Sequence, residues 1–106
     1  MYRVAVVDDE ITVCRRLKDA FEKNGYEVES FQVGQTFWER MTSAPFQIIF
    51  LDIKLPDIDG IEILTQLKGH YEDTQVIVMT GYGSIDSAIE AIKQGAYHYV
   101  TKPFKL

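Results

Sequence analysis

Apolar residues in this chain form short runs, separated by longer stretches in which they recur every three or four positions. Three nearly unbroken runs cover residues 3–7, 47–51 and 75–79, a pattern typical of strands buried on both faces of a parallel sheet. Residues 26–31 instead alternate apolar and polar side chains, which predicts an edge strand with one wetter face. A fifth strand is predicted over residues 96–100, which are rich in aromatic and branched side chains.

The stretches between these runs have the periodicity of helices. One apolar stripe covers residues 13–21 and stops near Gly25, and a weaker one covers residues 33–41. Another stripe covers residues 85–92, where Ser84 is the expected N-cap. Each stripe predicts a helix that packs one face against the sheet.

A further helix is predicted from the stripe over residues 61–67. Asp59 and Glu62 are placed as a capping pair at its start, and Gly69 is expected beyond its end. Strand and helix therefore alternate along the whole chain. This order predicts an α/β fold, a doubly wound five-stranded parallel sheet with right-handed crossovers and helices on both faces.

Composition limits the class of protein. The chain has 106 residues, of which 46% are hydrophobic, as expected for one compact domain. It has no apolar stretch near the roughly 20 residues that span a bilayer, it starts without a signal-like segment, and its one cysteine, Cys14, cannot form an internal disulfide. We therefore expect a cytoplasmic protein. A net charge of -5 argues against direct nucleic-acid binding by this segment.

Polar side chains follow the predicted strands. Because the carboxyl ends of parallel strands meet at one rim, where doubly wound sheets bind ligands, we expect these side chains to lie together. They are Asp8, Asp9 and Glu10 after the first strand, Asp52 after the third, Thr80 after the fourth and Lys102 after the fifth.

A cluster of carboxylates at this rim favours a cation. Adjacent carboxylates repel one another and raise the pKa of at least one of them unless a cation neutralises them. Hard oxygen ligands with incomplete protein coordination suit Mg²⁺, with Mn²⁺ as an alternative. Lys102 and the Thr80 hydroxyl then supply a positive charge and a hydrogen-bond donor for an anion beside the metal. Together these groups indicate a phosphoryl-transfer site.

Four motifs in this order resemble the CheY-like receiver domain of bacterial two-component response regulators. They are "VVDDE", "LDIKLPDIDG", "VIVMTGYGS" and "GAYHYVTKPF", and the resemblance covers essentially the whole chain. It implies a flavodoxin-like sheet of strand order 2-1-3-4-5. Among receivers, the chain is most similar to those of transcription regulators of the enhancer-binding class related to the nitrogen regulator, with short helix-turn-helix activators of the nodulation and nitrogen-fixation type next.

The resemblance implies a role for each rim residue. Asp52 is the expected phosphoacceptor, which takes a phosphoryl group from a phosphohistidine on a sensor histidine kinase. Asp9 is expected to bind Mg²⁺ directly, Asp8 directly or through water, and the backbone carbonyl of Lys54 completes the set. The family pattern also implies that Thr80 and Lys102 contact the phosphoryl oxygens and that the bond from Lys102 to Pro103 is cis.

The resemblance further implies a two-state switch. Tyr99 matches the aromatic residue that turns inward as the threonine, here Thr80, moves toward the phosphoryl group. Residues 82–99 are the surface expected to change and to contact an output domain or a second copy of the chain. The domain is expected to be a regulator with weak self-phosphorylation and self-dephosphorylation chemistry, whose phosphorylation lifetime is tuned by Lys54 and Tyr82.

Each assignment has a simpler structural alternative. Asp8 and Asp9 suit the positive end of a helix, half-buried tyrosines such as Tyr99 are common in strands, and Asp57 and Asp59 suit the turn around Pro56 and the cap of the next helix.

Other functions fit the sequence less well. A phosphatase of the haloacid dehalogenase type resembles Asp-x-Asp, whereas Lys54 stands two residues after Asp52, and "GYGSID" has Asp86 in place of a third phosphate-loop glycine. A receiver-like module that has lost phosphorylation would lack a key residue. The family usually continues into a fifth helix, which this chain does not contain, so we expect residues 1–106 to be a C-terminally truncated receiver domain with an exposed apolar patch beside residues 13–21.

Overall fold

The computed structural model describes residues 2–81 and 85–103, in which strands and helices alternate as predicted. The strands are β1 (Arg3–Val7), β2 (Glu27–Phe31), β3 (Ile48–Asp52), β4 (Gln75–Thr80) and β5 (His98–Thr101). The helices are α1 (Ile11–Glu22), α2 (Gly34–Ser43), α3 (Gly60–His70) and α4 (Ile85–Lys93).

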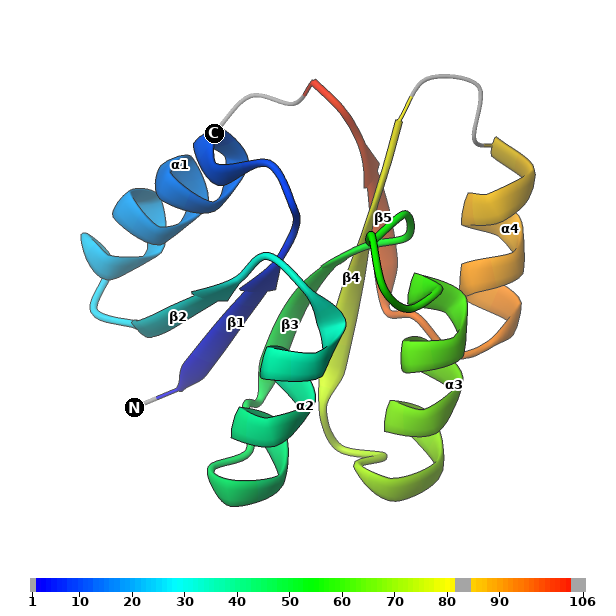
Figure 1. Ribbon diagram of the computed structural model, residues 1–106, viewed down its shortest axis with the longest axis horizontal. Coiled ribbons are helices and arrows are strands. Elements are labelled where there is room, and N and C mark those ends of the chain that lie inside the picture. Colours follow the sequence, from blue (N-terminus) through cyan, green and yellow to red (C-terminus); the bar gives the residue numbers. More distant parts are fainter. Residues whose placement is uncertain (1, 82–84, 104–106) are drawn as a thin grey trace.

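The five strands form one parallel sheet of order β2-β1-β3-β4-β5, which confirms the predicted topology (Figure 1). β2 lies at an edge, as its alternating pattern predicted. The register aligns Val7 with Leu51, and Leu51 with Val78, so the carboxyl ends of the central strands lie side by side. This alignment creates the shared rim.

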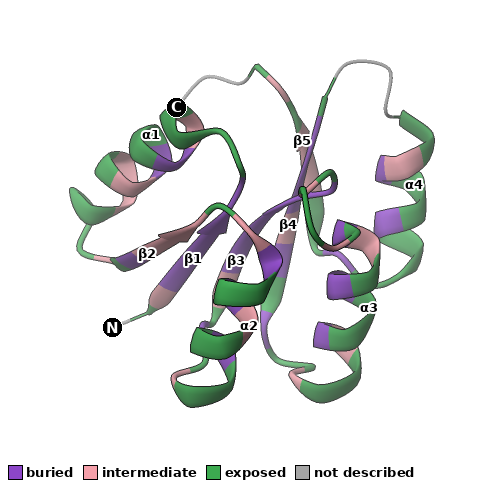
Figure 2. Cartoon of the chain, viewed as in Figure 1, coloured by how far each residue is buried: buried purple, intermediate pink, exposed green. Residues whose placement is uncertain are grey.

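Helices cover both faces of the sheet, and the central strands are buried between them (Figures 1 and 2). α2, α3 and α4 pack on one face, over a core that includes Ala5, Val7, Phe37, Met41, Phe46, Ile49, Leu51, Ile63, Leu64, Leu67, Val76 and Val78. On the other face, α1 packs over a smaller core of Val4, Val6, Cys14, Leu17, Val28, Phe50 and Met79. Burial on both sides explains why β1, β3 and β4 read as nearly continuous apolar runs.

The α1 face of the sheet is less completely covered than the other. Within residues 2–81 and 85–103, α1 is the only helix on this face (Figure 1). Ile48, Ile77 and Val100 on β3, β4 and β5 are only partly buried there. This is the face on which the sequence predicts an exposed apolar patch. In the same described ranges, no helix is long and apolar enough to cross a membrane.

Two predicted element ends were wrong by a few residues. α3 was expected to end before Gly69 but continues to His70, and the Tyr71 N–H donates to the Leu67 carbonyl at 2.6 Å. A glycine at an exposed helical position costs only about 1 kcal/mol, so Gly69 does not stop the helix. β5 starts at His98, not residue 96, because the Ala96 N–H still bonds to the end of α4. The predicted N-cap Ser84 lies outside the described residues.

Candidate functional site

Backbone hydrogen bonds fix the chain where each strand ends, and they bring the predicted site residues to one rim. The Asp8 N–H donates to the Phe31 carbonyl at 2.9 Å, which continues the pairing of β1 with β2. The Lys102 N–H donates to the Thr80 carbonyl at 2.7 Å, which joins the ends of β4 and β5. Asp52 is the last residue of β3, between these pairs.

Three carboxylates gather at this rim. Oxygens of Asp8, Asp9 and Asp52 all lie within 4.8 Å of one another. Asp8 is fully buried and Asp52 is 7% exposed, whereas Asp9 faces solvent. The structure therefore assembles the three side chains that the sequence predicts as metal ligands, and their spacing suits one small divalent cation.

Lys102 contacts three acids at once. Its Nζ lies 2.7 Å from Oδ2 of Asp8, 3.0 Å from Oε1 of Glu10 and 3.3 Å from Oδ2 of Asp52. Burial acts to lower the pKa of Lys102, but the attraction of these acids raises it above its ordinary value, so the side chain stays charged. The peptide bond from Lys102 to Pro103 is cis, which confirms the expectation from the motif.

Glu10 is a contact of Lys102 to which sequence reasoning gave no role. It is 60% exposed and immediately precedes α1. Its position beside Asp8 and Asp9 was the available signal, but an exposed acid next to a helix start is also a common arrangement for the helix alone.

Asp8 is the most perturbed acid of the cluster. Its Oδ1 accepts a hydrogen bond from the Glu10 N–H at 2.8 Å, while its buried Oδ2 makes the ion pair with Lys102 but accepts no well-formed hydrogen bond among the described residues. Burial raises the pKa of Asp8 to about 6, against the lowering effect of Lys102 and the Glu10 N–H, and the charge of Asp52 adds a smaller increase. Burial therefore raises the pKa of Asp8 more than the repulsion between carboxylates, which is the cause that the sequence predicts. A buried carboxylate oxygen whose one partner is an ammonium group suits a cation ligand.

The loop after β3 folds closely around Asp52. The Lys54 N–H donates to Oδ1 of Asp52 at 3.1 Å, and the Gly60 N–H donates to the Ile53 carbonyl at 2.8 Å. A Cβ at Gly60 would lie 2.6 Å from the Asp52 carbonyl oxygen, so only glycine fits at this position. Within the described part of the chain, no hydrogen bond ends on the Lys54 carbonyl, which leaves that oxygen free to act as the predicted ligand.

Thr80 and Tyr99 lie on the sheet face that α4 covers. Thr80 is buried, and its hydroxyl donates to the Val100 carbonyl at 3.4 Å. Tyr99 pairs in register with Val78 and packs its partly buried ring against the core on the α4 side. The two predicted switch residues thus belong to neighbouring strands and face the same helix layer.

The predicted interaction surface carries exposed apolar side chains. Ile85, Ile89 and Ile92 on α4 are 60%, 48% and 42% exposed, and Tyr97 is 70% exposed. Tyr82, predicted to tune the lifetime of the phosphoryl group, lies outside the described residues.

Comparison with known proteins gives the class of the chain. The family model for the response regulator receiver domain matches residues 4–106, so the chain belongs to the receiver domain family of response regulators. It is 38% identical over 104 residues to the regulatory protein AtoC of Escherichia coli strain K12, a match that covers 98% of this chain and 23% of AtoC. It is 30% identical over 102 residues to the transcriptional regulatory protein FixJ of Bradyrhizobium diazoefficiens, covering 96% of this chain and 50% of FixJ.

A solved structure agrees with this assignment. The receiver domain of NtrX from Brucella abortus is 29% identical to this chain, covers 96% of it with 87% of its own length, and superimposes with a TM-score of 0.91. The chain spans half or less of the length of AtoC and FixJ. The chain is therefore a regulatory receiver domain of a family that generally binds Mg²⁺ and whose members here include transcriptional regulators.

Proposed function

We propose that this chain is a phosphorylation-dependent signalling switch in which Asp52 accepts a phosphoryl group from the phosphohistidine of a sensor histidine kinase. The observation that carries the proposal is the environment of the Asp52 carboxylate. One oxygen accepts the Lys54 N–H at 3.1 Å, the other lies 3.3 Å from the Lys102 ammonium, and the acids of Asp8 and Asp9 stand beside it. The Asp52 carboxylate thus has a backbone N–H donor, the Lys102 ammonium and two further carboxylates beside it.

The reaction forms a bond between one Asp52 oxygen and phosphorus while the phosphorus–nitrogen bond of phosphohistidine breaks, and the electron pair of that bond stays on the imidazole nitrogen. Lys102 and the Lys54 N–H offset the negative charge on the transferred group, which is the main catalytic need in phosphoryl transfer. Asp8, Asp9, Asp52 and the Lys54 carbonyl would hold Mg²⁺, or Mn²⁺ in its place, and the bound cation would supply further positive charge to offset that of the phosphoryl group.

Phosphorylation then changes the α4 face. The added oxygens compete with the Val100 carbonyl for the Thr80 hydroxyl, and Tyr99 follows on the same side of the sheet. The exposed apolar residues within the segment 82–99 form the surface for an output domain or a second copy of the chain. Water returns the switch to its resting state by hydrolysing the acyl phosphate, at a rate tuned by Lys54 and Tyr82.

The relatives support a biological setting for this switch. Because AtoC and FixJ are regulatory proteins, we propose that residues 1–106 act as one receiver domain that controls transcription through an output domain in the cytoplasm. Direct nucleic-acid binding by this acidic segment is not part of the proposal.

Intact mass spectrometry tests the proposal. The chain is incubated with a small phosphodonor in Mg²⁺ and, separately, in EDTA. We expect one phosphoryl group to be gained in Mg²⁺ only, and none in Asp52→Asn. Asp59→Asn is the matched control, since Asp59 lies in the loop that follows Asp52 and caps α3 by accepting the Ile61 N–H at 2.8 Å. Equal phosphorylation of Asp52→Asn and wild type would refute the assignment.

A further inference from the structure

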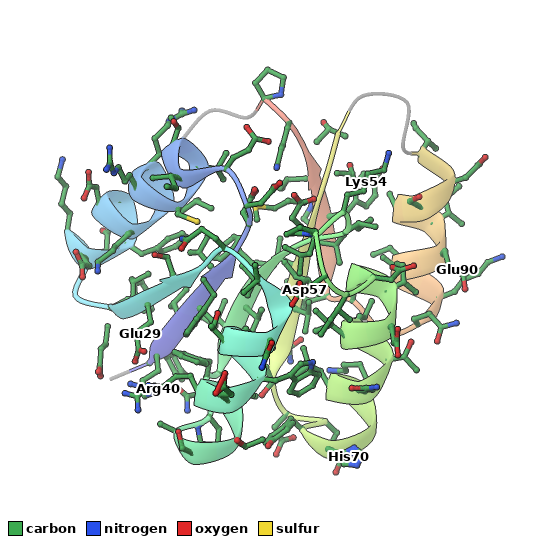
Figure 3. The ribbon with its side chains drawn as sticks, in the orientation of Figure 1. Glu29, Arg40, Lys54, Asp57, His70 and Glu90 are labelled. Atoms are coloured by element: carbon green, nitrogen blue, oxygen red, sulfur yellow. The ribbon has the colours of Figure 1, made fainter. Side chains whose placement is uncertain are left out.

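Asp57 holds the start of a helix that is distant in sequence. Its Oδ1 accepts a hydrogen bond from the Gly34 N–H at 2.8 Å, and its Oδ2 accepts one from the Gln35 N–H at 3.0 Å. Val33, the local N-cap residue of α2, makes no side-chain cap hydrogen bond. The first-turn amides of α2 are therefore capped from the loop between β3 and α3 (Figure 3).

The sequence predicts that Asp57 and Asp59 serve the turn around Pro56 and the cap of the next helix, and the structure confirms Asp59 as that cap and adds a contact of Asp57 that was not predicted. Asp57 caps α2, whereas the next helix, α3, is capped by Asp59. The hydrogen bond from the Gly34 N–H, with others from the backbone, holds the pKa of Asp57 below its ordinary value, so its carboxylate is charged at neutral pH.

Apolar packing reinforces the polar contact. A Cβ at Gly34 would lie 3.0 Å from Cδ1 of Ile58 and 3.1 Å from Cδ1 of Ile63. Ile58, which follows Asp57, thus fills the space over the first residue of α2. The loop and the helix start are joined by hydrogen bonds and by close packing.

The other end of the same loop is the phosphoacceptor. The Lys54 N–H donates to Oδ1 of Asp52, and Lys54 pairs with Asp59 across the loop as an isolated antiparallel bridge. A group bound to the Asp52 carboxylate would lie beside Lys54, because the Lys54 N–H donates to Oδ1 of Asp52. The segment between Asp52 and Asp57 is short: Lys54 is bonded to Asp52 near one end, and Asp57 is bonded to α2 at the other.

From this connection we infer that Asp57 is a positioning residue that couples the Asp52 site to α2, so that α2 responds when the site binds a cation or a phosphoryl group. The inference rests on the proposed function and adds a second responsive surface to the segment 82–99. α2 lines a groove of about 410 Å³ against α3, formed by Trp38, Thr42, Gln66, His70 and Tyr71. A movement of α2 changes the shape of this groove.

Trp38 provides a direct reporter of that movement. It is the only tryptophan of the chain, it is partly buried against Phe37 with ring centroids 5.4 Å apart, and it lines the groove. We expect Mg²⁺ to change the fluorescence of Trp38 and the amide chemical shifts of Gly34 and Gln35 in the wild-type chain. Calorimetric titration with Mg²⁺ measures metal binding independently of the tryptophan.

The test compares Asp57→Ala with Asp59→Ala. Both remove an exposed, helix-capping carboxylate from one loop, so they match in charge and in loss of a cap. We expect Asp59→Ala to retain the Trp38 response and Asp57→Ala to bind Mg²⁺ severalfold more weakly and to lose most of the response at saturation. Asp57→Asn keeps one acceptor oxygen, so it should give an intermediate response, and it provides the test if the alanine variant unfolds.

The possible failures are distinguishable. If wild type binds Mg²⁺ and accepts phosphoryl groups while Trp38 and the two amides do not respond, or if Asp57→Ala responds fully, the coupling is wrong and the proposed function stands. If wild type neither binds Mg²⁺ nor accepts a phosphoryl group, the proposed function fails and the coupling fails with it.

Discussion

The ammonium of Lys102 lies 2.7 Å from Oδ2 of Asp8, a carboxylate oxygen that has no exposed surface and no other partner among the described residues. The same ammonium also serves Glu10 and Asp52, so one positive charge faces three negative ones. Excess negative charge in a buried place costs stability and favours any cation that enters. The cluster of acids therefore lowers the stability of the folded chain when no cation is bound.

The cost should be visible in the stability of Asp8→Asn. The pKa of Asp8 in the folded chain, about 6, lies above its value of 3.8 outside the fold. Its contribution to stability is therefore fully present below pH 3.8 and is lost as the pH rises through 6. This difference in pKa corresponds to a loss of about 3 kcal/mol in the free energy of unfolding at neutral pH. Asp8→Asn removes this loss, but it also removes the ion pair with Lys102, so the net gain in stability is smaller.

Urea unfolding in EDTA at several pH values checks this prediction. We expect Asp8→Asn to be more stable than wild type by about 1 to 3 kcal/mol at pH 7, with a smaller difference near pH 4. Saturating Mg²⁺ should stabilise wild type and shrink the difference, since Mg²⁺ binds the folded carboxylates. A difference that is independent of pH and of Mg²⁺ would contradict this view of Asp8.

Gly60 and Gly69 offer a paired test within α3. A Cβ at Gly60 would lie 2.6 Å from the Asp52 carbonyl, whereas nothing lies within 4 Å of a Cβ at Gly69. Gly60→Ala should therefore destabilise the chain by about 2 to 3 kcal/mol and slow phosphorylation by displacing Asp52. Gly69→Ala should stabilise it by about 0.5 to 1 kcal/mol. Thermal melting of both variants measures the difference, and equal effects would show that the close approach at Gly60 is not needed.

Thr80 and Thr74 separate switching from stability. The Thr80 hydroxyl donates over 3.4 Å to Val100, a long hydrogen bond, whereas the buried Thr74 hydroxyl donates over 2.9 Å to Phe46. Thr80→Val should cost under about 1 kcal/mol, and Thr74→Val about 1 to 2 kcal/mol because it leaves a buried acceptor unpaired. Amide hydrogen exchange of α4 should change on phosphorylation in Thr74→Val but not in Thr80→Val. The opposite pattern would remove Thr80 from the switch.

Much of the fold follows from local patterns. β1, β3 and β4 are recognisable because both of their faces are buried, and α1 because one stripe of it is. Once the strands were predicted, the rim residues followed, because parallel strands bring their carboxyl ends to the same edge of the sheet.

Individual hydrogen bonds between distant segments were not predictable in this way. Asp57 caps Gly34, 23 residues earlier in the chain, and no local pattern distinguishes this arrangement from a cap of the helix that follows. The sequence placed Glu10 and Lys102 at the same rim, but their hydrogen bond, which joins residues 92 positions apart, depends on the directions of the two side chains there. The dominant cause of the raised pKa of Asp8 is burial, which depends on the packed structure as a whole.

Mapping the phosphorylated residue shows whether Asp52 is the phosphoacceptor. The acyl phosphate formed with a small phosphodonor and Mg²⁺ is reduced with borohydride. The chain is then digested with trypsin, and the fragment masses are measured by mass spectrometry. The fragment of residues 41–54, between the cleavage sites at Arg40 and Lys54, contains Asp52 as its only acidic side chain. We expect the modification in this fragment alone and its loss in EDTA. A modification in the fragment that contains Asp8 and Asp9, or none in any fragment, would contradict this expectation.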